Sequence, residues 1–67
     1  MTRSILVVDD DPAFRELARR LVTAAGLTVV GEAATATEAL AVARELRPDA
    51  ALVDIDLPDR NGVALAH

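Results

Sequence analysis

Four aspartates that stand directly after apolar runs are the best candidates for chemistry in this chain. Asp9, Asp10 and Asp11 follow the first apolar run, and Asp54 follows the run 51–53. Clustered carboxylates repel one another, so a site that gathers several of them usually needs a cation to hold them together. Mg²⁺ prefers such oxygen ligands. The sequence therefore predicts a magnesium site, provided that the fold brings the aspartates together.

The two apolar runs that precede these aspartates predict strands. Ile-Leu-Val-Val at 5–8 and Ala-Leu-Val at 51–53 are unbroken and apolar. The strand that contains the second run is expected to cover 50–54 and can reach 55. Such runs are typical of strands buried on both faces of a parallel sheet. Ligands of such sheets bind at the carboxyl ends of the strands, where the strand order reverses. If the first and third strands are neighbours, Asp9, Asp10 and Asp54 converge at that point.

A helix is expected between the first and second strands. Asp11 can serve as its N-cap and Pro12 as its first residue, and Gly26 supplies a stop after about Ala25. Apolar residues at helical spacing predict a buried stripe, with Phe14 in the core and the arginines on a solvated face. The stripe consists of Phe14, Leu17, Ala18, Leu21, Val22 and Ala25, and the solvated arginines are Arg15, Arg19 and Arg20.

The next elements are a less apolar strand and a second helix. The strand covers 27–30 and can reach 33, and its polar residues indicate a sheet edge. Thr35 and Glu38 have the spacing of a capping box, which predicts a helix start. Pro48 disfavours a helical conformation for the preceding residue and so ends this helix. Residues 56–62 are rich in turn formers, and 63–67 could begin a third helix.

Composition narrows the functional classes. The 67-residue chain has a formal net charge of −4, which argues against nucleic-acid or anionic-membrane binding by this segment. It contains no cysteine, which excludes a disulfide framework, a thiolate nucleophile and a sulfur-ligated metal. The only N-terminal apolar stretch is too short for a signal peptide or a membrane span. We expect a cytoplasmic protein that does not contact membranes.

Taken together, these motifs resemble the receiver domain of bacterial two-component response regulators. The resemblance rests on Ile-Leu-Val-Val-Asp9-Asp10-Asp11-Pro12, on Asp54-Ile-Asp-Leu-Pro58 and on Gly62. It implies an α/β fold, the flavodoxin-like (CheY-like) doubly wound parallel sheet, here truncated after the third strand. Residues 1–67 are then expected to be the N-terminal portion of a receiver domain, with any output domain absent. The stretches 30–33, 38–40 and 47–49 look most like regulators of the LuxR (NarL) type, whose C-terminal domain is a helix-turn-helix.

The resemblance also implies a role for individual residues. Asp54 matches the residue that accepts a phosphoryl group from a sensor histidine kinase. Asp10 matches a direct Mg²⁺ ligand, Asp9 an acidic neighbour that often acts through water, and Asp56 a residue whose backbone carbonyl completes the metal shell. Receiver domains continue through two more strands that carry a Ser or Thr and a Lys near the phosphoryl group. The expected protein is a phosphoacceptor rather than a turnover enzyme, and it would regulate transcription through a C-terminal domain that binds DNA.

Two alternatives remain open at this stage. In the first, Asp54-Ile55-Asp56 is the Asp-x-Asp of a haloacid-dehalogenase-like phosphohydrolase, although that pattern normally follows the first strand and Pro58 stands here in place of Thr or Val. In the second, the chain is a non-phosphorylatable receiver fragment that acts only by association. An apolar, unpaired edge of the third strand would then pair in a homodimer or with a sheet-completing partner. We assign no role to His67.

Overall fold

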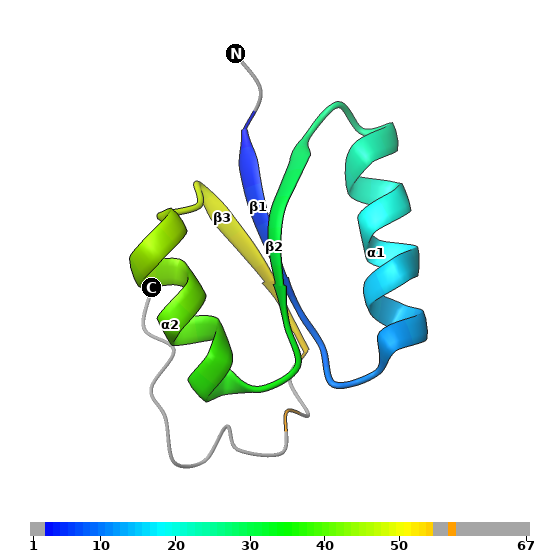
Figure 1. The fold of residues 1–67 in the computed structure, drawn as a ribbon. Helices are drawn as coiled ribbons and strands as arrows, with labels where there is room; N and C mark the ends of the chain where they lie inside the picture. The colour runs from blue at the N-terminus through cyan, green and yellow to red at the C-terminus, as the bar shows by residue number, and fades with distance from the viewer. Residues whose placement is uncertain (1–2, 55–56, 58–67) are drawn as a thin grey trace.

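The computed structural model describes residues 3–54 and Leu57, which form three strands and two helices (Figure 1). Strands and helices alternate along the chain, as the sequence predicts. The third helix predicted to begin at 63–67 lies outside the described residues. The elements are β1 (Ser4–Val8), α1 (Pro12–Ala24), β2 (Thr28–Ala33), α2 (Ala36–Leu46) and β3 (Ala50–Val53).

The three strands form a parallel sheet in the order β2-β1-β3. β1 is central and pairs with β3 from Ile5↔Ala50 to Val8↔Val53. The prediction that the first and third strands are neighbours is therefore confirmed. β2 lies at an edge of this sheet, as its polar residues indicated. The order places the carboxyl ends of β1 and β3 side by side.

The core lies on both faces of β1, because side chains of a strand point alternately to opposite faces. Leu6 and Val8 pack with residues of α2, whereas Ile5 and Val7 pack with Val22 of α1. These four strand residues are only 1–6% exposed. The two helices thus cover opposite faces of the sheet (Figure 1), and the predicted burial of the first strand is confirmed.

The third strand is not buried, contrary to the prediction. All four residues of β3 are exposed, and Leu52 keeps 49% of its accessible surface. The reason is its position in the sheet. Within the described residues β3 borders only one strand, and both helices pack chiefly over β1 and β2. An apolar run predicts a strand, but it does not reveal whether helices cover that strand.

The apolar stripe of α1 is wider than the surface it buries. Val22 is buried and Ala18 is partly buried against the sheet, but Phe14 is 59% exposed and Leu17 and Leu21 are also exposed. The prediction of Phe14 as a core residue is therefore wrong for the described structure. The helix packs on β1 and β2 through one flank of its stripe, which leaves the other flank uncovered.

The ends of α2 follow the sequence signals closely. The Thr35 hydroxyl accepts from the Glu38 backbone N–H at 3.1 Å, and Glu38 reaches back to the N–H of Ala34 at 2.9 Å. The predicted capping by Thr35 and Glu38 is therefore confirmed. The backbone N–H that donates to Glu38 is that of Ala34, whereas in the usual capping box it is that of the cap residue itself. Before Pro48 the helix ends at Leu46, and its C-cap Arg47 has a left-handed φ of 48°. Among the described residues, no helix is long and apolar enough to cross a membrane.

Candidate metal and phosphoacceptor site

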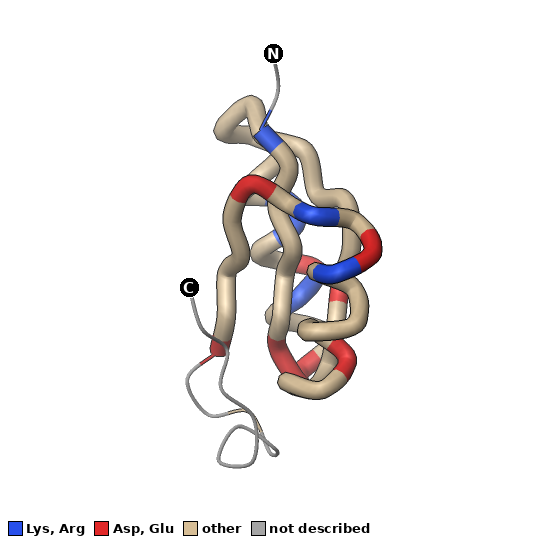
Figure 2. The backbone as a smooth tube through the Cα atoms, turned by 90° about the vertical axis from the view of Figure 1, so that its left-hand side faces the viewer, with Lys and Arg blue, Asp and Glu red and all other residues tan. Residues whose placement is uncertain are grey.

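Three aspartates converge at the carboxyl edge of the sheet. Asp9 directly follows β1 and Asp54 directly follows β3, and the backbone N–H of Asp54 donates to the carbonyl of Val8 at 2.9 Å. Carboxylate oxygens of Asp9, Asp10 and Asp54 all lie within 4.8 Å of one another. Figure 2 shows acidic segments at the lower end of the backbone, where β1 and β3 end. The predicted convergence of these three residues is confirmed.

The turn between β1 and α1 is held in place by backbone and side-chain hydrogen bonds. The backbone N–H of Asp9 donates to the carbonyl of Ala33 at 3.0 Å, which ties the turn to the end of β2. One carboxylate oxygen of Asp9 accepts from the N–H of Asp11 at 2.9 Å. The Asp11 carboxylate accepts in turn from the N–H of Ala13 at 2.9 Å. Asp11 is therefore the N-cap of α1, as predicted, and is not part of the acidic trio.

The trio has the donor chemistry of a site for a hard cation. Asp9 and Asp54 are partly buried and Asp10 is exposed, so the cluster opens to solvent. All of its ligand atoms are carboxylate oxygens, which suit Mg²⁺ and Ca²⁺ rather than softer metals. Mg²⁺ is usually held by one or two carboxylates together with phosphate oxygens and water. An open cluster of three carboxylates fits that requirement.

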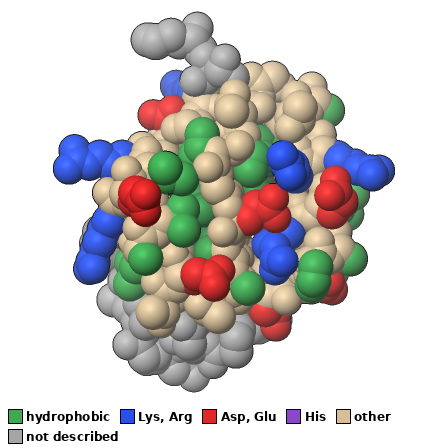
Figure 3. All heavy atoms as spheres, viewed as in Figure 1, with side chains coloured by type: hydrophobic (Ala, Val, Ile, Leu, Met, Phe, Trp, Pro, Cys, Tyr) green, Lys and Arg blue, Asp and Glu red, His purple; other side chains and the backbone are tan. Residues whose placement is uncertain are grey.

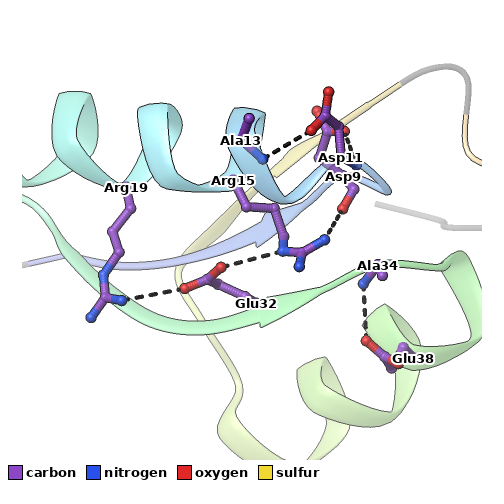
Figure 4. Close-up of polar contacts among 8 residues, drawn as sticks. All are labelled: Asp9, Asp11, Ala13, Arg15, Arg19, Glu32, Ala34 and Glu38. Atoms are coloured by element: carbon purple, nitrogen blue, oxygen red, sulfur yellow. Dashed lines mark hydrogen bonds and ion pairs between the residues drawn. The ribbon is translucent and has the colours of Figure 1, made fainter.

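Arg15 is the residue of this region that the sequence prediction missed. Its Nη1 donates to the carbonyl of Asp9 at 2.7 Å, and its Nε lies 3.4 Å from a carboxylate oxygen of Glu32 on β2 (Figure 4). The side chain of Arg15 is 21% exposed, so its assignment to a solvated face is wrong. Its position three residues before Ala18 and seven before Val22 could have placed it on the face of α1 that packs on the sheet.

Several predicted site residues lie outside the described residues. They include Asp56, whose backbone carbonyl was expected to complete the metal shell, and His67, to which no role was assigned. The loop residues Pro58 and Gly62 also lie outside the described residues. The described part of the site therefore consists of the acidic trio and the groups that position it.

At the opposite end of the sheet, hydrogen bonds between Asp49 and Ser4 form a separate polar contact, here called the clasp. The Asp49 carboxylate accepts from the backbone N–H of Ser4 at 2.8 Å and from its hydroxyl at 3.2 Å. These hydrogen bonds, with a smaller contribution from the charge of Arg3, hold the pKa of Asp49 below its usual value. The clasp ties the starts of β1 and β3 together, at the end of the sheet remote from the acidic trio.

Comparison with known proteins agrees with this geometry. The sequence profile of the response regulator receiver domain matches residues 5–67. The chain belongs to this family. The chain is 38% identical over 63 residues to the chemotaxis protein CheY of Thermotoga maritima, covering 94% of this chain and 52% of that protein. It is 42% identical over 65 residues to the DNA-binding response regulator MtrA of Mycolicibacterium smegmatis, covering 94% of this chain and 27% of that protein.

The chain is also similar to a protein whose name states an enzymatic activity. The chain is 39% identical over 59 residues to a protein-glutamate methylesterase/protein-glutamine glutaminase of Hahella chejuensis, covering 88% of this chain and 17% of that protein. The chain thus spans about half of CheY and much less of the other two relatives. The resemblance to receiver domains and the CheY-like fold class are confirmed. The receiver family and the position of Asp54 after the third strand both speak against the Asp-x-Asp phosphohydrolase.

Proposed function

We propose that this chain is the phosphoacceptor segment of a response regulator, with Asp54 as the residue that receives the phosphoryl group. The observation that carries the proposal is the convergence of Asp54 with Asp9 and Asp10 at the ends of two adjacent parallel strands. Membership of the receiver family supports the same role. In this proposal Asp9, Asp10 and Asp54 hold Mg²⁺, and the backbone carbonyl of Asp56 adds a further ligand.

The proposed step is the transfer of a phosphoryl group between two nucleophiles. A carboxylate oxygen of Asp54 attacks phosphorus, the bond from phosphorus to the donor histidine nitrogen of a sensor kinase breaks, and an acyl phosphate forms on Asp54. Mg²⁺, when bound, neutralises negative charge that would otherwise repel the incoming group. Asp9 and Asp10 supply the charge that holds the cation, and the hydrogen bond from Asp54 N–H to Val8 fixes the nucleophile beside them.

The proposed wider role is that of a switch for a separate output. MtrA is named as a DNA-binding response regulator, and by analogy we propose transcription regulation through a DNA-binding domain in the complete protein. A phosphoacceptor of this kind is not a turnover enzyme, although it can contribute to its own phosphorylation and dephosphorylation. The proposed partner is a sensor histidine kinase, and the proposed compartment is the cytoplasm.

We also propose that the exposed edge of β3 pairs with further sheet, either from the complete protein or from a second copy of the chain. Two observations support this. β3 is apolar and exposed along its whole length, and such edges promote strand pairing. Beside it, an apolar groove of about 440 Å³ lies between β1, β3 and α2, lined by Leu6, Leu40, Ala51 and Val53 among others. Light scattering that finds the 67-residue chain as a stable 7.1 kDa monomer would contradict this proposal.

The phosphoacceptor role is tested with a phosphodonor and the complete protein. We expect a Mg²⁺-dependent, alkali-labile phosphoadduct that disappears in Asp54→Asn. Asp49→Asn is the matched control, because it makes the same substitution at the other end of β3, away from the trio. A phosphoadduct that persists in Asp54→Asn would show that Asp54 is not the acceptor. Sustained phosphatase turnover that Asp56→Asn abolishes would instead favour the phosphohydrolase.

A further inference from the structure

We propose that Arg15 is a positioning residue for the metal site, acting by bridging the Asp9 backbone to Glu32 on β2. The inference rests on the proposed function, because it concerns the same acidic trio. The guanidinium of Arg15 donates to the backbone carbonyl of Asp9 at 2.7 Å. It therefore acts on the main chain that carries the ligands.

The bridge requires the shape of a guanidinium. Nη1 faces the Asp9 carbonyl, and Nε lies 3.4 Å from one carboxylate oxygen of Glu32 (Figure 4). Arg19 pairs with the other Glu32 oxygen at 3.5 Å, so Glu32 is held from two positions of α1. A lysine ammonium is a single point charge and does not reproduce this fixed fork. The bridge thus joins the start of α1, the turn and β2.

The environment makes this contact stronger than an ordinary surface ion pair. Arg15 is 21% exposed on its side chain and Glu32 34%. By contrast, the pair between Arg20 and Glu16 on the outer side of the same helix is exposed on both partners, with Arg20 at 78%. Exposed pairs of that kind contribute little to stability. Figure 3 shows basic and acidic side chains interspersed over β2 and α1. Arg15 also reaches the turn that carries Asp9, through its hydrogen bond to the carbonyl of that residue.

Three contacts together define the position of Asp9. Its N–H is bound to Ala33, its carboxylate to the N–H of Asp11, and its carbonyl to Arg15. The first two come from backbone groups that any sequence would supply. The third depends on the side chain at position 15. Groups that orient metal ligands without touching the metal typically contribute 10–100-fold to metal affinity.

The sign of the effect on Mg²⁺ binding separates positioning from simple electrostatics. A positive charge near the trio opposes a bound cation, so by charge alone Arg15→Met would tighten Mg²⁺ binding. If Arg15 positions Asp9, the same substitution weakens binding, by about tenfold at the lower end of the usual range. Arg20→Met is the matched control, because it removes the same charge from the outer side of the same helix.

The experiment measures Mg²⁺ affinity by calorimetric titration of the complete protein, under conditions in which every variant is fully folded. We expect about tenfold weaker binding in Arg15→Met, weaker binding in Arg15→Lys, and a change of less than about twofold in Arg20→Met. Unchanged or tighter binding in Arg15→Met, or unchanged affinity in Arg15→Lys, would overturn the inference. No Mg²⁺ binding by the unsubstituted protein would overturn the proposed metal site itself.

A second pair of variants keeps the test available if Arg15→Met does not fold. Glu32→Gln preserves the size of the side chain but weakens the support of Arg15, whereas Glu16→Gln makes the same change in the exposed pair with Arg20. We expect Glu32→Gln to weaken Mg²⁺ binding several-fold more than Glu16→Gln. Equal affinities in these two variants would overturn the inference.

Discussion

Repulsion within the acidic trio predicts that removing one of its charges stabilises the metal-free protein. Asp10 is the best position, because it is exposed and its isosteric change to Asn disturbs no packing. Two charges 4.8 Å apart repel by about 1 kcal/mol at the dielectric of water, so relieving both of Asp10's pairs yields about 2 kcal/mol. Losing a negative charge before the N-terminus of α1 costs about 0.3–1 kcal/mol. The expected net gain is about 1 kcal/mol.

Urea unfolding of the receiver domain in the presence of a chelator measures this gain. Glu45→Gln is the control, because it makes the same change in net charge at the far end of α2 and should shift stability by less than about 0.5 kcal/mol. Mg²⁺ should reverse the order of the two stabilities, because a ligand at free concentration L stabilises the folded state by RT ln(1 + L/Kd) and Asp10→Asn removes one of the groups that hold the cation. The reasoning is refuted if metal-free Asp10→Asn is no more stable than Glu45→Gln, or if its advantage persists at saturating Mg²⁺.

Three further predictions concern the scaffold. The pKa of Asp49 is lowered in the folded protein, so its hydrogen bonds to Ser4 contribute stability above the ordinary pKa of about 3.8. This contribution is lost as the pH falls through the lower folded pKa. Asp49→Asn should therefore reduce the loss of folding stability at acidic pH, and an unchanged acid dependence in urea unfolding would contradict this prediction. Leu6→Ala should cost about 2–5 kcal/mol in urea unfolding, whereas Leu52→Ala should cost under about 1 kcal/mol; similar costs would contradict the burial pattern. Thr35→Ala should cost about 1 kcal/mol by loss of the cap, with Thr35→Ser restoring most of it.

The site was more predictable from the sequence than the packing around it. Asp9 and Asp54 each follow an apolar run, and a parallel sheet brings the carboxyl ends of neighbouring strands to one edge. Asp11 as a cap follows from local geometry, because the bond to the N–H of Ala13 spans two residues. Predictions of this kind need only short-range patterns and one topological rule.

The wrong predictions concern the burial of side chains, because burial depends on which elements pack on each face of the sheet. The stripe that includes Phe14 is apolar over a wide angle, but α1 contacts the sheet through only part of it. β3 reads as a buried strand, yet its position at the edge leaves Leu52 exposed. Arg15 was missed for the converse reason, since a charged residue on the inner face has its partners on β2 and in the turn. The helical spacing of Arg15 to Ala18 and Val22 could have placed it on the inner face, but a single sequence does not show which groups it contacts there.

The central claim is that Asp54 carries the phosphoryl group, and its most direct test is chemical mapping of the modified residue. Borohydride reduction converts an aspartyl phosphate to homoserine, which peptide mass spectrometry locates in the sequence. The complete protein, phosphorylated in the presence of Mg²⁺, should give homoserine at Asp54 and at no other aspartate. Homoserine at Asp9 or Asp10, or its absence from Asp54 in protein that carries the phosphoryl group, would contradict the account.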